Sequence, residues 1–276
     1  MGGAAARRWR RPPSTRWRKR RSEPVSLEPA KNPLGKTLLF GVGLGPGDPD
    51  YMTVRARDII LSADRLVHFC KRGRRGHARI TADAVVGPNA AREIALAFPV
   101  TIEVPVEDEG YSGPITQFYD ESAALLAAEM EAGRSVAVLC DGDPFFYGSF
   151  MHLWRRLSHR FPTEVVPGVT GMAGAWTRAN APITWGDDIL TVLPGTLPEA
   201  ELVRRLADTD AAVIMKLGRN LPKVRRALEA TGLIGRAIYV EQATMAGQAI
   251  IRLSERDDAE APYFSMVLVP GEGRRL

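Results

Sequence analysis

The run SVAVLC, from Ser135 to Cys140, limits the fold of this chain more than any other stretch. Its last five residues present no charged or hydroxyl side chain, so both faces of a strand formed here would be buried. A strand buried on both faces is typical of the centre of a parallel sheet that helices cover on both sides. The run therefore predicts an α/β fold.

Short apolar runs alternate with amphipathic stretches along the rest of the chain, which predicts two α/β units with parallel or mixed sheets. Further strands are expected at residues 37–43, 65–70, 100–106, 190–195, 211–218, 237–244 and 263–270. Helices are expected at residues 53–63, 80–86, 116–132, 199–207 and 220–230. The hydroxyl of Thr53 can cap the first of these helices.

Composition divides the chain into four segments. Residues 36–165 and 186–276 are the two expected α/β domains, with a ligand in the cleft between them. Residues 166–185 are rich in Gly, Pro and Ala, and we expect them to link the domains and contact that ligand. Residues 1–35 hold ten Lys or Arg and two Glu, whereas the rest of the chain holds 27 basic and 30 acidic residues. This charge separation predicts a disordered basic tail on a mildly acidic folded body.

The basic tail leaves one alternative function open, because an arginine-rich arm can bind nucleic acid. Nothing after residue 35 reads as a nucleic-acid-binding module, which disfavours that alternative. No membrane partner is expected, since no apolar run approaches the ~18 residues of a membrane span. Cys70 and Cys140 lie far apart, and neither they nor the histidines have metal-ligand spacing. We therefore expect a cytoplasmic protein with reduced thiols and no metal.

The stretch LFGVGLGPGDPDYMT, residues 39–53, carries alternating glycines directly after the first apolar run. A dinucleotide site needs Gly-x-Gly-x-x-Gly or Ala, and the sixth position here is Pro46 in one frame and Asp48 in the other. Pro46 and Pro49 also lack the backbone N–H groups that a phosphate would bind. The stretch therefore disfavours a nicotinamide-dependent dehydrogenase.

A second loop, Asp141 to Pro144, follows the buried run of the first paragraph. Ligands of open α/β sheets bind at the carboxyl ends of strands, which places Asp141 and Asp143 beside a ligand, together with Asp48 of the first loop. Ionised carboxylates only accept hydrogen bonds, so these loops predict a ligand that donates hydrogen bonds or carries positive charge. The alternative is that each Asp-Pro or Gly-Pro pair simply forms a tight turn.

Three motifs in order, GLGPGDP (43–49), GDPFFYG (142–148) and PGVT (167–170), resemble those of the S-adenosylmethionine-dependent tetrapyrrole methylases. The resemblance runs from about residue 36 to the C-terminus, and longer stretches such as DGDPFFYGSFMHL and EQATMAGQ resemble the branch that methylates carbon 20 of precorrin-2. It implies a homodimeric C-methyltransferase of cobalamin biosynthesis, with S-adenosylmethionine as methyl donor and precorrin-2 as substrate. A cobalt-containing substrate or another ring position is the alternative.

The resemblance also implies which residues contact the methyl donor. They are Pro46, Gly142, Asp143, Phe145, Phe146, Tyr147, Thr170, Gly171, Met215, Ala243 and Thr244. Gly171 departs from the family pattern, because many relatives carry Ser or Ala there. S-adenosylmethionine carries an ammonium, a sulfonium and two hydroxyls, which agrees with loops rich in carboxylates.

Precorrin-2 is a polycarboxylate, so its site should present Lys and Arg side chains. The candidates are Lys71, Arg72, Arg74, Arg75, Lys216 and Arg219, although the first four also fit a solvated charge run. The methylated carbon must then lose a proton, and a base can assist. The candidate bases are Asp48, Glu109, Tyr111 and Asp141, with solvent as the alternative. No covalent enzyme intermediate is expected.

Overall fold

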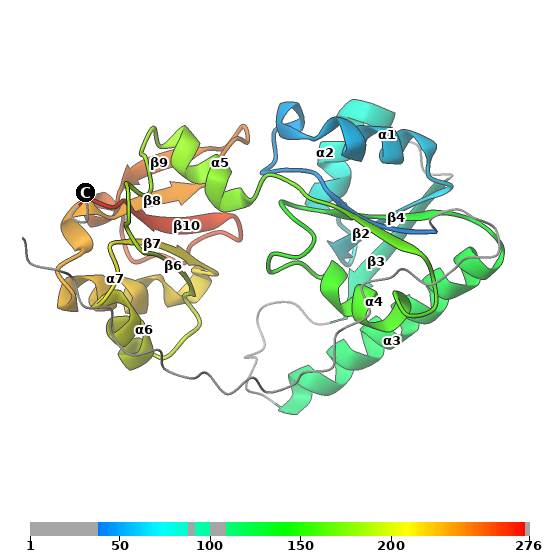
Figure 1. The fold of residues 1–276 in the computed structure, drawn as a ribbon. Helices are drawn as coiled ribbons and strands as arrows, with labels where there is room; N and C mark the ends of the chain where they lie inside the picture. The colour runs from blue at the N-terminus through cyan, green and yellow to red at the C-terminus, as the bar shows by residue number, and fades with distance from the viewer. Residues whose placement is uncertain (1–37, 88–91, 100–108, 274–276) are drawn as a thin grey trace, which may run out of the picture.

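The computed structural model describes residues 38–87, 92–99 and 109–273, with only the backbone at residues 109–112. This part of the chain forms two lobes, each built on a five-stranded sheet (Figure 1). The α/β fold expected from the sequence is thereby confirmed. The expected basic tail and the strand expected at residues 100–106 lie outside the described residues.

The N-terminal lobe has a fully parallel sheet in the order β3-β2-β4-β1-β5. Helices α1 and α2 cover one face of this sheet, and α3 and α4 cover the other (Figure 1). Its elements are β1 (Leu39–Gly43), η1 (Pro49–Tyr51), α1 (Val54–Ser62), β2 (Arg65–Lys71), α2 (His77–Val86), β3 (Glu93–Phe98), α3 (Glu109–Glu131), β4 (Val136–Cys140), α4 (Phe150–Leu157) and β5 (Thr163–Val166).

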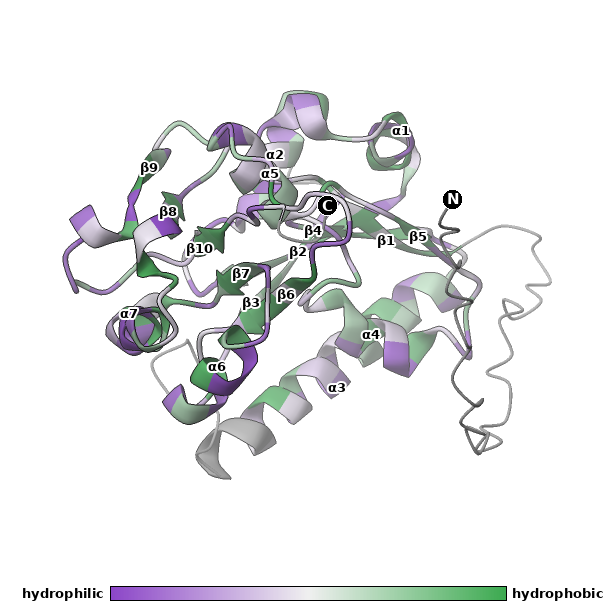
Figure 2. Ribbon diagram, turned by 60° about the vertical axis from the view of Figure 1, so that its left-hand side comes forward, coloured by the Kyte–Doolittle hydropathy of each residue, from purple (hydrophilic) through white to green (hydrophobic). Residues whose placement is uncertain are grey.

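Strand β4 joins the two cores of this lobe. Val136, Val138 and Cys140 pack against α3 and α4, whereas Ala137 and Leu139 pack against α1 and α2. Successive side chains of a strand point to opposite faces, so this run serves both cores at once. Figure 2 shows β4 and β1 in hydrophobic colours, while the helices around them alternate between polar and apolar residues.

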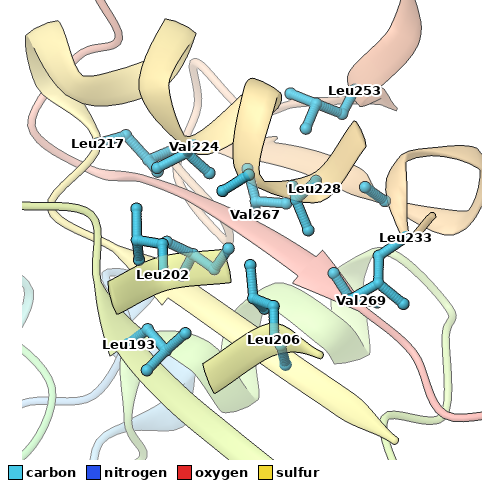
Figure 3. Close-up of a cluster of buried hydrophobic side chains, with 14 of the residues drawn as sticks. Leu193, Leu202, Leu206, Leu217, Val224, Leu228, Leu233, Leu253, Val267 and Val269 are labelled. Atoms are coloured by element: carbon cyan, nitrogen blue, oxygen red, sulfur yellow. The ribbon is translucent and has the colours of Figure 1, made fainter. Parts of the chain in front are cut away.

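The C-terminal lobe has a mixed sheet in the order β6-β7-β10-β8-β9, in which only β6 and β7 pair in parallel. Helices α6 and α7 cover one face over a leucine-rich core (Figure 3), and α5 covers the other. Its elements are α5 (Gly171–Arg178), β6 (Leu190–Pro194), α6 (Glu199–Leu206), β7 (Ala211–Met215), η3 (Gly218–Asn220), α7 (Leu221–Ala230), η4 (Ile234–Arg236), β8 (Ile238–Glu241), β9 (Ala249–Arg252), η5 (Leu253–Glu255) and β10 (Ser265–Val269).

Several elements were not expected from the sequence: β3, α4, β5, α5 and β9. Strand β3 reads EIALAF, a sequence with weak strand propensity, and it is extended because it pairs with β2 along its whole length. Helices α4 and α5 have eight residues each. Helix α5 falls within the Gly- and Ala-rich segment 166–185 and packs against the second sheet.

Strands β1 and β4 lie side by side but send the chain to opposite faces of the first sheet. The chain continues from β1 into α1 on one face and from β4 into α4 on the other. Open α/β sheets bind their ligands where neighbouring strands diverge in this way. The loops after β1 and β4, residues 44–48 and 141–149, therefore lie at the expected ligand position.

Arg79 of α2 is a completely buried cation in the same lobe. Its guanidinium donates to Asp83 Oδ1 at 2.5 Å, to the carbonyl oxygen of Gly87 at 2.8 Å and to the carboxylate of Glu93. These bonds connect α2 with its own C-terminal end and with β3. Removal of one partner from such a network leaves an uncompensated buried charge.

We expect Arg79→Leu to lower the free energy of unfolding by about 3–5 kcal/mol, because Glu93 loses its buried partner. Arg75→Leu is the matched control, since Arg75 is exposed and pairs with the same Asp83. Its effect should be much smaller, because solvent screens an exposed pair. Urea denaturation measures both losses, and equal losses would contradict a buried structural role for Arg79.

Candidate functional site

Three glycines bring the ends of β1, β4 and β5 into contact. A Cβ added at Gly168 would overlap the carbonyl oxygen of Gly142 and lie 2.9 Å from Gly43 Cα. A Cβ added at Gly43 would lie 2.5 Å from the backbone nitrogen of Gly168. The amide of Gly142 donates to the carbonyl of Gly45 at 2.8 Å, which bridges the loops after β1 and β4. These contacts explain why the motifs require glycine at these positions.

The loop after β1 docks on the C-terminal lobe. The amide of Asp48 donates to Thr244 Oγ1 at 3.1 Å. Pro46 is buried against α5, where a Cβ added at Gly174 would lie 2.6 Å from Pro46 Cβ. Gly47, with φ 133°, contacts the side chain of Met245. The loop thus connects the first sheet to both α5 and the loop after β8.

Two of the three candidate carboxylates order their own loops. Asp143 accepts hydrogen bonds from the amides of Phe145, at 2.9 Å, and Gly168, at 3.1 Å. Asp48 accepts a hydrogen bond from the amide of Asp50 at 3.0 Å and caps η1. Each carboxylate therefore has a local partner that fixes the loop conformation.

Asp141 differs from them. Among residues 38–87, 92–99 and 109–273, no hydrogen bond or ion pair engages its carboxylate. Solvent reaches the residue, yet protein surrounds it closely enough that desolvation raises the pKa of Asp141 to about 7. This combination places a carboxyl group that has no partner among the described residues at the end of the central strand.

Tyr263 stands near Asp141 on the side of the C-terminal lobe. Burial and the negative charge of Asp141 raise the pKa of Tyr263, and Tyr119 adds a smaller effect. The ring of Tyr263 has 70% of its surface exposed and contacts Phe264 with a centroid distance of 4.9 Å. The electrostatic influence of the N-terminal lobe therefore reaches Tyr263.

Residues predicted to hold the cofactor gather from both lobes at this junction. The position of a Cβ on Gly142 is 3.5 Å from the nitrogen of Gly171 and 3.8 Å from Thr170 Cα. Thr170 caps α5, and Met215 and Ala243 pack in the core beneath that helix. Together with Pro46 and Thr244, these residues form one continuous region.

The aromatic residues of the loop after β4 face two directions. Phe145 contacts Trp154 of α4, with ring centroids 5.4 Å apart, and therefore lies against its own lobe. Phe146 contacts Tyr147 at 4.9 Å. The ring of Tyr147 faces the other lobe, where Lys216 Nζ lies 5.0 Å from its centroid. Of the three, Tyr147 makes the contact between lobes.

The basic loop after β2 contains both paired and unpaired cations. Arg75 forms a bidentate pair with Asp83 at 2.7 and 2.9 Å, so its guanidinium is already engaged. Lys71, Arg72 and Arg74 are exposed, and within the described part of the chain they have no ion-pair partner. Three of the four predicted substrate-binding cations in this loop are thus free to meet an anion.

The basic loop and the turn after β7 lie on the same side of the junction. His77, which follows the loop, contacts Phe264 edge-on with a centroid distance of 4.7 Å. The carbonyl of Phe264 accepts a hydrogen bond from the amide of Gln242 at 2.7 Å, at the start of β10. Because β10 pairs with β7 in antiparallel fashion, the start of β10 lies beside the end of β7, so His77 at the start of α2 lies close to the strand that precedes Lys216.

Two of the candidate bases, Glu109 and Tyr111, lie at the start of α3. Both belong to the first turn of this helix, and their side chains lie outside the described residues.

Sequence reasoning missed Tyr263, Phe264 and Met245 as residues of the junction. The signal was available for the aromatic pair, which begins the strand expected at residues 263–270, but its position depends on the antiparallel direction of β10.

Metal ligands and membrane spans were searched in the described ranges. These ranges contain no group of three or more His, Cys, Asp or Glu residues that could hold a metal ion. None of their helices combines the length and apolar character of a membrane span. Cys70 and Cys140 are both buried free thiols.

A family model described as Tetrapyrrole (Corrin/Porphyrin) Methylases matches residues 38–257. The chain belongs to this family. The resemblance inferred from the three sequence motifs is therefore confirmed. The match covers the N-terminal lobe and most of the C-terminal lobe of this methylase and excludes the basic tail, so nothing in it favours the nucleic-acid alternative.

Individual members of the family are similar to this chain over most of its length. The methylase is 54% identical over 238 residues to a Precorrin-2 C(20)-methyltransferase of Sinorhizobium sp, covering 86% of this chain and 97% of the relative. It is 32% identical over 233 residues to a Cobalt-precorrin-2 C(20)-methyltransferase of Salmonella typhimurium, covering 84% and 95%. A structure of uroporphyrin-III C-methyl transferase from Thermus thermophilus complexed with S-adenyl homocysteine shares the fold, with a TM-score of 0.60 and 21% identity over 86% of this chain and 99% of that one.

We expect Gly168→Ala to destabilise the methylase by about 1–3 kcal/mol or more, because the added methyl group meets backbone that cannot move aside. Gly171→Ala is the matched control, since its Cβ would meet only the flexible end of Met266 at 3.7 Å. Chemical denaturation compares the two variants. A tolerated Gly168→Ala variant would contradict the close packing of the strand ends.

Proposed function

We propose that this methylase transfers the methyl group of S-adenosylmethionine to carbon 20 of precorrin-2, giving precorrin-3A in cobalamin biosynthesis. The observation that carries the proposal is the 54% identity to a Precorrin-2 C(20)-methyltransferase over 97% of that relative. Identity to the Cobalt-precorrin-2 C(20)-methyltransferase is lower, at 32%, which supports the metal-free substrate over the cobalt-containing one.

The residues at the junction fit the chemistry of the methyl donor. Its ammonium and hydroxyl groups need acceptors, and the closely packed backbone at Gly142, Thr170 and Gly171 can offer carbonyl oxygens there. Met215 and Ala243 offer apolar surface to an adenine ring, and Pro46 and Thr244 border the same region. When bound, S-adenosylmethionine supplies an electrophilic methyl group. We assign these residues to the binding of S-adenosylmethionine.

The protein's main contribution to methyl transfer is positioning. A carbon–carbon bond forms at carbon 20 as the carbon–sulfur bond breaks, and no side chain needs to act as a nucleophile. Holding two reactants in line can lower a barrier by up to ~7–11 kcal/mol. Loops from both lobes orient the reactants and exclude water at the junction under this proposal.

The carbon that gains the methyl group must release its proton. Asp141 is the candidate that we assign to this step, because its carboxylate has no partner in the described part of the chain and its pKa of about 7 suits proton transfer near neutral pH. Asp48 is engaged in capping η1. The proton passes from carbon 20 to a carboxylate oxygen of Asp141 and then to solvent.

The unpaired cations form the proposed recognition surface for the carboxylate arms of the substrate. Lys71, Arg72 and Arg74 border the junction from the N-terminal lobe, and Lys216 and Arg219 border it from the C-terminal lobe. Charge-assisted hydrogen bonds to carboxylates are about twice as strong as neutral ones. Cations on both lobes can therefore hold a macrocycle between them.

The proposal also includes a cytoplasmic homodimer. Two buried free thiols are compatible with a reducing compartment. Phe145 and Trp154, which are 46% and 37% exposed and contact each other, offer apolar surface to a second copy. Analytical ultracentrifugation of the purified protein tests the dimer.

We expect the purified protein to convert precorrin-2 to a product with one additional methyl group when it is supplied with S-adenosylmethionine carrying a ¹³C-methyl label. Mass spectrometry counts the methyl groups, and NMR locates the label at carbon 20. The cobalt-containing substrate is the control and should react much more slowly. Label at another carbon, or faster reaction of the cobalt compound, would select the alternative enzymes.

We expect Asp141→Asn to lower the turnover rate by about 100-fold or more, which is the usual contribution of a positioned base. In the unchanged protein the rate should rise as pH rises through about 7, since only the ionised carboxylate accepts a proton. Asp50→Asn, an exposed neighbour of the first loop, is the control. An unchanged rate in Asp141→Asn would mean that solvent accepts the proton.

Asp141→Asn should lower the turnover rate but raise the stability of the folded protein. The pKa of Asp141 in the folded protein, about 7, is higher than its ordinary value of 3.8, so the folded state binds this proton more tightly than the unfolded state. The folded protein therefore loses stability as pH rises from 3.8 to about 7. Asp141→Asn should lack this loss and be the more stable protein at pH 8, as thermal denaturation can show.

A further inference from the structure

Strained backbone gathers at the lobe junction. Five non-glycine residues of the described ranges have φ in the left-handed region: Tyr147 (53°), Asn180 (49°), Lys216 (55°), Gln242 (46°) and Thr244 (68°). All but Asn180 belong to the loops that follow β4, β7 and β8 at the junction. Such conformations persist only where surrounding contacts enforce them, and they concentrate at functional sites.

Two of these strained residues contact each other across the junction. Lys216 Nζ lies 5.0 Å from the centroid of the Tyr147 ring. The Tyr147 ring is 44% exposed, and Lys216 is exposed as well. Within the described ranges no carboxylate pairs with Lys216, so the ring face is the partner that the structure gives its charge.

The backbone on both sides of Lys216 is fixed. The carbonyl of Met215 accepts a hydrogen bond from the amide of Gly195 at 2.6 Å. The side chain of Leu217 is 1% exposed in the core beneath α6 and α7. The left-handed turn between these anchors presents the Lys216 side chain to the opposite lobe, which a continued strand would not do.

We propose that Lys216 binds a carboxylate arm of the macrocycle, and that the ring face of Tyr147 is the partner that its ammonium leaves when that arm arrives. This inference rests on the proposed function for the identity of the macrocycle, and it requires only a ligand with several carboxylates. A cation over an exposed ring is bound weakly, whereas an ammonium–carboxylate hydrogen bond is stronger. Exchange of the ring for a carboxylate is therefore favourable.

The proposal predicts that substitutions of Lys216 and of Tyr147 have different effects on ligand binding. If the contact only joins the lobes, loss of either partner should have the same effect on ligand binding. If the ring competes with the ligand for Lys216, loss of the lysine should weaken binding and loss of the ring should not. Tyr147→Phe is a matched control, because it keeps the ring and removes the hydroxyl.

The experiment measures the affinity of the full-length protein, without cofactor, for precorrin-2 under anaerobic conditions and for uroporphyrin III, a tetrapyrrole with eight carboxylates. Lys216→Gln should weaken the binding of both macrocycles by about tenfold. Tyr147→Phe should leave both affinities unchanged. Tyr147→Leu should leave them unchanged or tighten them about two- to fivefold, since the ring no longer competes.

Equal weakening by Lys216→Gln and Tyr147→Leu, or unchanged binding in Lys216→Gln, would overturn the proposal. S-adenosylhomocysteine affinity in Lys216→Gln should stay within about twofold of the unchanged protein, which separates macrocycle binding from damage to the whole junction. A protein that binds uroporphyrin III through Lys216 but methylates no precorrin-2 would contradict the proposed function alone. A protein that methylates precorrin-2 while Lys216→Gln binds normally would contradict this inference alone.

Discussion

The close approach of Gly43, Gly142 and Gly168 is the constraint on which the rest of the site depends. Side chains at Gly43 and Gly168 would collide with the backbone of the neighbouring strand ends, and Gly142 has a φ of 67°, so glycine permits the ends of β1, β4 and β5 to meet. Their approach lets Gly142 bond to Gly45 and lets Asp143 accept the amide of Gly168. The loops after β1 and β4 are thereby fixed to each other before any ligand binds.

This fixed pair of loops determines how the lobes meet. The loop after β1 reaches Thr244 and Gly174 in the C-terminal lobe, and the loop after β4 reaches Lys216 through Tyr147. Carboxylates that look equivalent in the sequence consequently differ in chemistry. Asp143 accepts hydrogen bonds within the loop structure, whereas Asp141 has no partner among the described residues and carries a raised pKa. Of these two carboxyl groups, that of Asp141 is therefore the one available to a ligand.

The sequence predicted the fold class and the strands with strong apolar runs, because burial on both faces leaves a direct compositional signal, as in β4. The cap at Thr53 was also predicted, and its hydroxyl accepts the amide of Ala56 at 3.1 Å. Strand β3 was missed because pairing with β2, a contact remote in sequence, overrides its weak propensity. The position of Tyr263 was inaccessible for the same reason, since it depends on packing between the lobes. The engagement of Arg75 by Asp83 spans only eight residues, but it depends on how the basic loop turns into α2.

The central claim is that loops of both lobes hold one methyl donor at their junction, and hydrogen–deuterium exchange tests it most directly. Exchange is compared in the unliganded protein and in the protein saturated with S-adenosylhomocysteine. The account predicts slower exchange in residues 44–48, 141–148 and 242–248 together, with little change around the leucine-rich core of α6 and α7. Protection confined to one lobe, or located away from these three loops, would contradict it.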